Sequence, residues 1–470
     1  MSTKSRRHFL ARAGKGFGAA AASTLLPSAL GTESPLAPRK AHEPARAKAI
    51  IYLYMHGGVS HVDTWDPKPE LTRLSGKTLP ASFVKGLKTS RIDFTKALAR
   101  GSAWPFQKHG QSGLEISALF PNIARHADQL ALVRSCHGDA FDHAPAMYLH
   151  GSGSQFPGRP CLGAWTVYGL GSENQNLPAF VVMTDGAMKC GPQGYGAGFL
   201  PAVYQGTMFR SGKSPVLDLS NPDGVSNRTQ RTTLDLVSEL DRQHLGERPF
   251  DSDLEARLAA YELAFRMQSE APEAVDMSKE TDATKRLYGI GDGPSDDFGR
   301  KCLLARRLVE RGVRFVQLYS GTHLGDDWDG AHNDLTGSHN KMAAKTDKAI
   351  SGLLTDLQAR GLADSTLVVW GSEFGRTPLA EGRNGRDHHP YAFSMWFWGA
   401  GARGGRVLGS TDEFGLRPAE NPIVSHDVNA TILRMMGLDH LKLTYYFQGR
   451  DMRLTDVHGE GEFTKFLVEG

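Results

Sequence analysis

AIIYLYM, residues 49–55, is an unbroken run of apolar residues in which β-branched and aromatic side chains predominate. A run of this kind predicts a strand that is buried on both faces, as the strands of parallel sheets are. The run stops at His56-Gly57-Gly58, where a polar loop begins. The stretch therefore predicts one interior strand of a sheet whose two faces are both covered.

Five further stretches predict buried strands of the same kind, at residues 131–134, 179–183, 313–319, 365–370 and 394–398. Helical periodicity occupies much of the intervening sequence, at residues 116–127, 232–245, 253–268, 297–310, 339–360 and 427–436. This alternation predicts an α/β protein, a three-layer α/β/α sandwich with a mostly parallel sheet. The helical, Gly/Pro-rich stretch at about 200–300 predicts a cap or insertion within a domain that spans residues 46–460.

The N-terminal residues Ser5-Arg6-Arg7-His8-Phe9-Leu10, with the apolar run at 17–30, are typical of a twin-arginine export signal. The run is too short and too rich in glycine to span a bilayer. We therefore expect residues 1–45 to form a signal peptide and linker, with cleavage between Ala29 and Ala45. The expected partner is the twin-arginine translocase, the expected location is the periplasm or the medium, and no stable membrane span is expected after cleavage. Many proteins on this route take up a metal before export, which favours metal chemistry.

Charge and cysteine content exclude two classes of protein. The formal net charge is +3, and residues 1–36 carry a net charge of +4, so the mature protein has a net charge of about −1 and no nucleic-acid footprint. Four cysteines are too few for a disulfide scaffold. A Cys161–Cys190 bridge and buried free thiols are both compatible with the sequence.

Imidazole and carboxylate side chains gather around the ends of the predicted strands. Because ligands of open α/β sheets bind beyond the carboxyl ends of the strands, we expect these side chains at one edge of the sheet. Carboxylate oxygens and imidazole nitrogens suit divalent ions, and Asp329 and His332 can reach one ion from a short helix or tight turn. Solvated loop residues, with His332 capping a helix, are the alternative. The candidates are His61, Asp63, Asp329, His332, Glu373, Arg376, His388 and His389.

A further dense cluster, HGDAFDH at residues 137–143, follows the strand predicted at 131–134. A histidine such as His143 can act as a ligand, a general acid or a phospho-accepting nitrogen. Capping of the next helix, with Asp142 as the N-cap, is an alternative that is compatible with function. Lys189 and the glycine-rich loop after it are candidates for holding an anionic group, and a simple turn is the alternative there.

The order of these segments resembles the alkaline phosphatase-like superfamily, which includes sulfatases and cofactor-independent phosphoglycerate mutases. Asp329 with His332, Ser372-Glu373-Phe374-Gly375, and His388 or His389 resemble three successive elements of the metal site in that superfamily. More narrowly, residues 48–456 are similar to an uncharacterised, twin-arginine-exported bacterial family of sulfatase-like proteins, domain of unknown function 1501. The stretches that carry this similarity are GGVSHVDTWDPKP at 57–69, WDGAH at 328–332, SEFGRTP at 372–378 and GRDH at 385–388.

Three departures from the superfamily pattern bear on the chemistry. The first strand ends in Gly57 and Gly58, where superfamily members usually carry metal-binding aspartates. Phe374 stands in place of a histidine, which removes one ligand of a second metal. His143 occupies the position of the sulfatase nucleophile, so no formylglycine is expected.

The resemblance implies an exported, metal-dependent hydrolase of sulfate or phosphate esters that uses Zn, Mn, Ca or Mg. Its expected substrate is a small anionic ester or a sulfated or phosphorylated glycan. The alternative is a non-catalytic exported binding protein that keeps the fold and a vestigial metal site. In the hydrolase the expected metal ligands are Asp329, His332, Glu373 and His388, assisted by Asp63 and His61. The expected catalytic residues are His143, Ser60, Thr64 and Arg376, and the group that attacks the ester is a metal-bound water, Ser60 or Thr64. Lys189 and His389 are expected to hold the substrate.

Replacement of both Arg6 and Arg7 by lysine is expected to leave the precursor in the cytoplasm, because the translocase reads the guanidinium pair and lysine lacks its planar fork. The measurement is the amount of precursor and processed protein in cytoplasmic and periplasmic fractions. Arg12→Lys, outside the pair, is the matched control. An unchanged periplasmic yield of the double variant would show that another export route is used.

Overall fold

The computed structural model describes residues 34–89, 91–210, 216, 219, 221, 223–247, 252–322 and 326–469. The twin-arginine motif and its apolar run lie outside these residues, so export stays a prediction. Within the described part of the chain, no helix has both the length and the apolar character that crossing a membrane requires.

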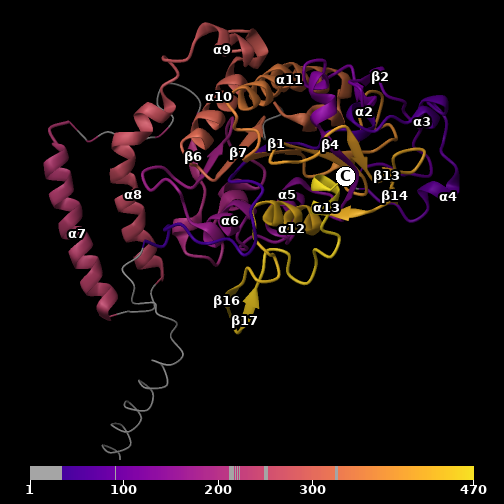
Figure 1. Cartoon of the computed structure of the whole chain (residues 1–470). Coiled ribbons are helices and arrows are strands. Elements are labelled where there is room, and N and C mark those ends of the chain that lie inside the picture. Colours follow the sequence, from indigo (N-terminus) through magenta and orange to yellow (C-terminus); the bar gives the residue numbers. More distant parts are fainter. Residues whose placement is uncertain are drawn as a thin grey trace, which may run out of the picture. The chain divides into compact units, whose positions relative to one another are not determined.

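A nine-stranded sheet forms the centre of the described chain, and β1 (Ala49–Met55) lies in its interior (Figure 1). Both neighbours of β1, β7 (Phe315–Ser320) and β8 (Thr366–Gly371), run parallel to it. The strand order is β12-β4-β11-β8-β1-β7-β5-β6, with β15 beside β4, and β11 runs antiparallel to both of its neighbours. The other strands are β4 (Ala131–His137), β5 (Phe180–Met183), β6 (Thr207–Phe209), β11 (Phe393–Trp398), β12 (Arg406–Leu408) and β15 (Ile423–Val424).

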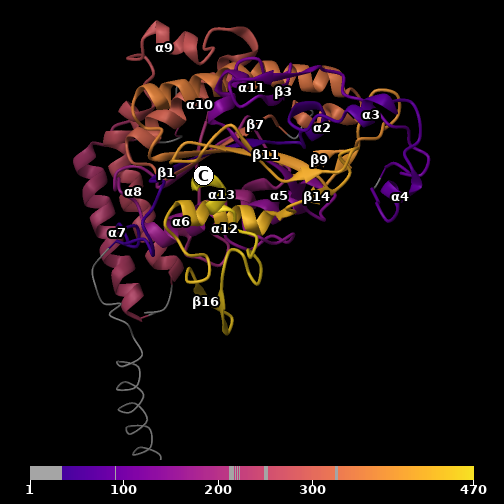
Figure 2. The same cartoon turned by 45° about the vertical axis from the view of Figure 1, so that its right-hand side comes forward.

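Helices cover both faces of this sheet. The odd-numbered residues of β1 from 51 to 55 join one hydrophobic core, and the even-numbered residues from 50 to 54 join the other. Figure 2 shows α10 and α11 over one face and α5, α6 and α12 against the other. These helices are α5 (His143–Ser152), α6 (Leu162–Leu170), α10 (Asp296–Glu310), α11 (Leu335–Ala359) and α12 (Ser425–Met435), with α13 (Thr464–Val468) beside α12. The predicted three-layer α/β/α architecture with a mostly parallel sheet is therefore confirmed.

Between β6 and β7 the chain forms the helices that the sequence predicts in an insertion. They are α7 (Asn227–Glu247) and α8 (Ser252–Val275), and a short helix that was not predicted, α9 (Asp282–Leu287), follows them. Met267, Ala271 and Ala274 of α8 are buried in the core that contains residues of α10 and α11. α8 therefore anchors this region to the main body, and a role as a cap stays a prediction.

The helix predicted at 116–127 is wrong. The structure has the strand β3 (Leu114–Ser117) followed by a short 3-10 helix, η1 (Ile123–Gln129). Ile116, Phe120 and Ile123 have the spacing of one helix face and are fully buried, but Pro121 between them has no N–H to donate.

Other short helices and strands are α2 (His61–Thr64), α3 (Pro69–Arg73), α4 (Ala81–Val84), β2 (Phe106–His109), β9 (Gly375–Arg376), β10 (His388–His389), β13 (Ser410–Thr411), β14 (Pro418–Glu420), β16 (Tyr445–Phe447) and β17 (Arg450–Met452).

The segment from Leu36 to Ala47 leads into β1 along α6 and α12. The N–H of Arg39 donates to the carbonyl of Leu170 at 2.9 Å, and the N–H of Arg46 donates to the carbonyl of Met435 at 2.9 Å. Leu36 is 4% exposed. The part of the expected linker that begins at Leu36 therefore packs as part of the folded body.

The four cysteines are buried and free. Of the two alternatives that the sequence leaves open, a Cys161–Cys190 bridge and buried free thiols, the structure therefore has the second. Burial raises the pKa of the Cys136 thiol well above its ordinary value, with a further contribution from Asp427. A buried thiol with a raised pKa is a poor nucleophile. The cysteines thus contribute to the core rather than to chemistry.

A fully buried ion pair joins the loop after β1 to the β9–β10 loop. Arg386 Nε donates to Asp63 Oδ2 at 2.8 Å, and both side chains are 0% exposed. Arg386 also donates to the carbonyl oxygens of Thr377 at 3.0 Å and Arg100 at 2.9 Å. Burial raises the pKa of Asp63, but the attraction of Arg386 outweighs it and keeps that pKa below its ordinary value. The pair thereby fixes the β9–β10 hairpin, which carries Arg376 and His388.

Asp63→Asn is expected to lower the free energy of unfolding by about 3–5 kcal/mol, because it leaves the Arg386 guanidinium buried without a counter-charge. Urea unfolding at pH 7, followed by circular dichroism, measures the loss. The control is Glu70→Gln, which breaks the exposed Glu70–Arg73 pair and is expected to cost far less. Equal losses in the two variants would contradict the structural role assigned to Asp63.

Candidate metal centre

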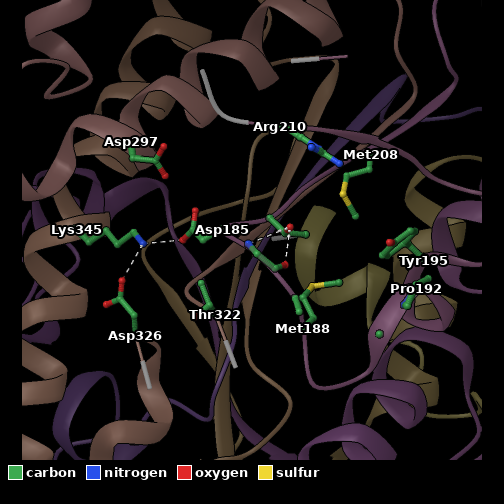
Figure 3. Close-up of a pocket in the computed structure, with 14 residues that line it drawn as sticks. Asp185, Met188, Pro192, Tyr195, Met208, Arg210, Asp297, Thr322, Asp326 and Lys345 are labelled. Atoms are coloured by element: carbon green, nitrogen blue, oxygen red, sulfur yellow. Dashed lines mark hydrogen bonds and ion pairs between the residues drawn. The ribbon is translucent and has the colours of Figure 1, made fainter. Parts of the chain in front are cut away.

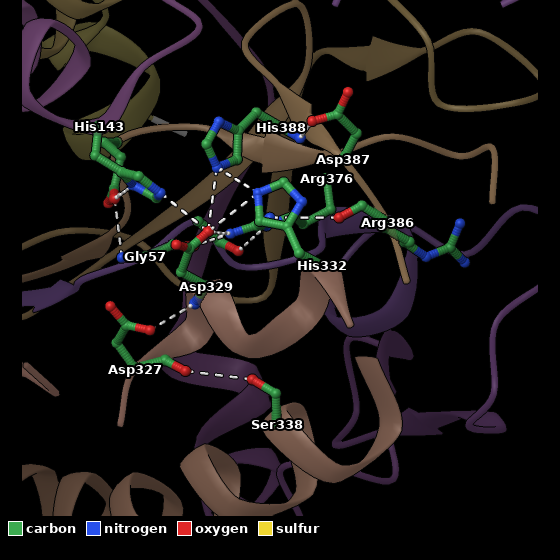
Figure 4. Close-up of polar contacts among 12 residues, drawn as sticks. Gly57, His143, Asp327, Asp329, His332, Ser338, Arg376, Arg386, Asp387 and His388 are labelled. Carbon is green, nitrogen blue, oxygen red and sulfur yellow. Dashed lines mark hydrogen bonds and ion pairs between the residues drawn. The ribbon is translucent and has the colours of Figure 1, made fainter. Parts of the chain in front are cut away.

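Side chains from four segments meet beyond the carboxyl ends of β7 and β8. Figure 4 shows His143, Arg376 and His388 around Asp329. Their common target is Asp329, in the short helix η5 (Trp328–His332) that follows β7. The N-cap of η5, Asp327, accepts the N–H of Asp329 at 3.0 Å and so fixes its backbone. The other contributors are Arg376 and His388 from the β9–β10 hairpin, His143 from the start of α5, and Lys189 from the loop after β5.

The carboxylate of Asp329 lies at the centre of this arrangement. Its Oδ1 atom lies 3.0 Å from Nε2 of His143, 3.1 Å from Nε2 of His388 and 3.3 Å from Nε2 of His332. The same oxygen accepts a hydrogen bond from Arg376 Nη2 at 2.7 Å, and Oδ2 accepts one from Lys189 Nζ at 2.5 Å. The Asp329 side chain is 24% exposed, so the centre is open to solvent.

Each of the three imidazoles is held by its other ring nitrogen. His143 Nδ1 lies 2.6 Å from Glu373 Oε1, His388 Nδ1 lies 2.7 Å from the carbonyl of Phe141, and His332 Nδ1 contacts Glu381. A carbonyl and an ionised carboxylate only accept, so each Nδ1 donates its proton, and in a neutral ring Nε2 then carries a lone pair. Burial lowers the pKa of His143, but hydrogen bonds to Asp329 and Glu373 outweigh it and raise that pKa above its ordinary value, so this ring donates from Nε2 to Asp329 when it is protonated. Histidines that bind metals are oriented by outer hydrogen bonds of this kind.

The contact between His332 and His388 shows why a cation fits here. Their Nε2 atoms lie 2.8 Å apart, and each has its Nδ1 proton directed away. In two neutral rings of these tautomers, two lone pairs face one another, which is unfavourable unless a proton or a metal ion lies between them. Ligand atoms around a tetrahedral ion are separated by roughly 3.3 Å for N and O ligands at 2.0–2.1 Å. The spacings of 2.8 to 3.3 Å among these two nitrogens and Asp329 Oδ1 are close to that value.

The charges at the centre also accommodate a dication. Carboxylates outnumber the lysine and arginine side chains, so a divalent ion offsets negative charge rather than adding to a positive excess. His332, Asp387 and His388 form one triplet whose potential ligand atoms lie within 4.8 Å of one another, and His143, Asp329 and His388 form another. The charged side chains are Asp327, Asp329, Glu373, Glu381 and Asp387 on the acidic side and Lys189 and Arg376 on the basic side.

The surroundings hold the carboxyl groups of Asp329 and Glu373 ionised. Burial raises the pKa of the Asp329 carboxyl, but its contacts with the imidazoles of His143, His332 and His388 and the positive charge of Arg376 outweigh it and keep that pKa far below the ordinary value. Burial likewise raises the pKa of Glu373, yet the bond to His143 brings it to about 2. Burial lowers the pKa of His388 to about 3, so its ring stays neutral and able to bind a cation.

Glu373 reaches the centre through His143 rather than directly. Its Oε1 accepts both the His143 ring and the N–H of Gly57, the latter at 2.8 Å. Gly57 has φ of +112°, and a Cβ atom there would lie 2.5 Å from the backbone nitrogen of Asp329. The glycine that replaces the aspartate of the superfamily pattern is therefore required by this close approach.

Arg376 and Lys189 differ in their access to solvent. Arg376 is fully buried, and it also donates to the carbonyl of Gly58 at 2.9 Å and contacts that of Gly57. Lys189 keeps 18% of its side chain exposed and lies between Asp329 and Asp327, 3.4 Å from Asp327 Oδ2. Arg376 therefore holds Asp329 in position, whereas Lys189 is exposed enough to bind a ligand.

The other candidate residues lie in a separate cluster around α2. Ser60 Oγ donates to Asp63 Oδ2 at 2.5 Å, and Thr64 Oγ1 donates to the carbonyl of Ser60 at 2.7 Å. His61 and His389 stack at 5.9 Å, and their Nε2 atoms contact the carbonyls of Gly415 and Leu416. The structure does not bring these five side chains to Asp329, because the Asp63–Arg386 pair and neighbouring carbonyls engage them.

Three residues at the centre were not among the candidates that the sequence indicates. Glu381 orients His332, and nothing in its sequence context, a polar loop, marks it out. Asp327 is identified only by its position as the N-cap of η5. His56 directly follows β1, is 0% exposed, and has no hydrogen-bond partner at either ring nitrogen among the described residues. Its Nδ1 lies 3.8 Å from Asp327 Oδ2. Its place at a strand end was the available signal.

Several solved structures are similar to this chain. The PsFucS1 sulfatase from Pseudoalteromonas sp. shares 13% identity over 88% of this chain and 72% of its own, with a TM-score of 0.38. Alkaline phosphatase from the Antarctic bacterium TAB5 shares 10% identity over 85% and 99%, with a TM-score of 0.36. The phosphonate monoester hydrolase SpPMH from Silicibacter pomeroyi shares 14% identity over 72% of each chain, with a TM-score of 0.35.

No curated protein matches the sequence. Residues 47–462, in contrast, match the profile of the family described as "Protein of unknown function (DUF1501)". This range includes the whole of the central sheet and every side chain of the centre around Asp329. The chain therefore belongs to the DUF1501 family.

Proposed function

We propose that the protein is an exported, metal-dependent hydrolase of sulfate or phosphate esters whose active centre surrounds Asp329. The observation that carries the proposal is the convergence of three imidazole Nε2 atoms on Oδ1 of Asp329, with each imidazole held through Nδ1. Arrangements of this kind are built where a cation binds. Export rests on the Arg6-Arg7 motif, and with it the expected location in the periplasm or the medium.

Asp329, His332 and His388 are the residues that would hold a divalent ion, because their ligand atoms lie closest to one another. Zn or Mn suits this set better than Ca or Mg, since two of the three ligand atoms are imidazole nitrogens. The ion would act as a Lewis acid that draws charge from an ester oxygen.

The protein's own groups bind and orient the anionic ester. The ammonium of Lys189 is the exposed cation beside Asp329, so it can pair with a sulfate or phosphate oxygen. Arg376 holds Asp329 in place from the buried side through Oδ1. Both cations offset charge that develops on the ester in the transition state.

His143 is the group that moves a proton. Glu373 fixes its ring through Nδ1, and its Nε2 faces the centre, which is the geometry of a positioned general acid or base. Ser60 and Thr64 are engaged by Asp63 and a carbonyl in the separate cluster. The attacking group in this proposal is therefore a water molecule, and His143 exchanges its proton.

His332→Ala is expected to reduce the amount of bound metal at least about tenfold, because it removes one ligand and the support of Glu381. Elemental analysis of protein purified through its native export route measures the metal. His389→Ala is the matched control, a buried histidine bonded to the Leu416 carbonyl in the other cluster, and it should keep its metal. Unaltered stoichiometry in His332→Ala would remove the proposed site.

His143→Ala is expected to lower kcat/KM for aryl sulfates or phosphates by at least about 100-fold while the metal content is retained, since it removes a positioned acid or base. Cys136→Ala, a buried thiol in the core, should keep full turnover. Full activity of His143→Ala would show that the residue has only a structural role at the start of α5. If the wild type hydrolyses no ester with any divalent metal, the binding-protein alternative is the better one. That alternative is favoured by the lack of a free hydroxyl nucleophile among the described side chains around Asp329.

A further inference from the structure

A cavity of about 830 Å³ lies beside the Asp329 centre, beyond the ends of β5, β6 and β7 (Figure 3). Two loops contribute to both. The loop after β5 places Met188 in the cavity wall and the next residue, Lys189, against Asp329. The loop after β7 places Asp326 in the wall and the next residue, Asp327, under the backbone of Asp329. A cavity of this size can enclose a small organic ligand.

The cavity has one mainly apolar and one polar wall, which Figure 3 shows on opposite sides. Side chains with large apolar surfaces line the first wall, and ionised side chains line the second. Arg210 lies beside the first wall and is exposed. The apolar wall comprises Met188, Pro192, Tyr195 and Met208, and the polar wall comprises Asp185, Asp297, Asp326 and Lys345.

The polar wall is held in place by its own ion pairs. Asp185 Oδ2 accepts from Lys345 Nζ at 2.6 Å and from the N–H of Gly321 at 2.8 Å. Its Oδ1 contacts Lys301, whose side chain is 2% exposed. Asp326 is paired with Lys341 at 2.8 Å. These contacts fix the polar atoms that face the cavity, so a ligand meets a preformed surface.

We infer that this cavity binds the alcohol part of the ester, and that this part is a sugar. The inference rests on the proposed function, which places the anionic group of the substrate at Lys189 and Asp329. A pyranose ring has a face of C–H groups and an edge of hydroxyl groups, and the two walls of the cavity match these two surfaces. An aliphatic alcohol would strip water from the polar wall without replacing its hydrogen bonds, which is costly.

The test compares two alcohols that carry the same anionic group. Methyl phosphate and methyl sulfate are too small to fill the cavity, whereas glucose 6-phosphate and glucose 6-sulfate extend into it. Release of inorganic phosphate or sulfate is measured for the wild type and for Met208→Trp, which narrows the cavity from its apolar wall. Tyr195→Ala removes a side chain of the same wall and serves if the first variant does not fold. Leu441→Trp is the matched control, at a residue that is 56% exposed and outside the cavity lining.

We expect Met208→Trp and Tyr195→Ala to raise KM for the sugar ester at least about tenfold and to leave KM for the methyl ester unchanged, because they remove only uniform binding of the sugar. Leu441→Trp should change neither. Equal effects on both esters, or none on the sugar ester, would overturn the inference.

Failure of the hydrolase itself gives a different result. If no ester is turned over, calorimetric titration with glucose 6-sulfate and glucose 6-phosphate replaces the kinetic measurement. Binding by the wild type that Met208→Trp or Tyr195→Ala abolishes would keep the cavity as a sugar site while the proposed reaction fails. No binding of either sugar ester to the wild type would overturn the cavity assignment as well.

Discussion

One carboxylate oxygen, Oδ1 of Asp329, sets the geometry of the functional edge of this protein. A carboxylate that is three-quarters buried is costly unless charged or polar partners surround it. The partners come from η5, α5, the β9–β10 hairpin and the loop after β5, and these four segments are far apart in the sequence. These segments must therefore end at the same edge of the sheet, and the parallel arrangement around β1 brings them there.

The same requirement explains two features that are unusual beside the superfamily pattern. Gly57 and Gly58 follow β1 because the chain passes directly against η5 and Phe374, where a Cβ atom would lie 2.5 Å and 2.6 Å from its nearest neighbours. The N–H groups and carbonyls of these glycines then hold Glu373 and Arg376. Backbone groups at this strand end thus hold two charged side chains of the centre.

Local patterns were sufficient to predict most of the architecture. AIIYLYM identified β1, because a strand buried on both faces needs apolar residues at every position. The prediction of a helix at 116–127 was wrong because the buried apolar residues of a strand, a loop and a 3-10 helix have the same sequence spacing as one face of an α-helix. At the site, strand ends indicated Asp329, His332 and His388. The sequence could not separate them from His61, Asp63 and His389, because the choice depends on Arg386, which is 323 residues from Asp63 in the chain. Glu381 could not be predicted at all, since its role depends on how the β9–β10 loop folds back onto His332.

Phe374 limits what this centre can bind. Its ring is fully buried and packs 4.5 Å from the ring of His388 and 4.9 Å from that of His143, measured between centroids. It occupies the sequence position at which the resemblance leads one to expect a ligand imidazole, but it offers no lone pair. The apolar ring instead restricts the two histidines to the side where Asp329 lies. Because the described ligand atoms converge on one oxygen from that side, the arrangement favours a single ion, with the ammonium of Lys189 supplying positive charge at the other carboxylate oxygen.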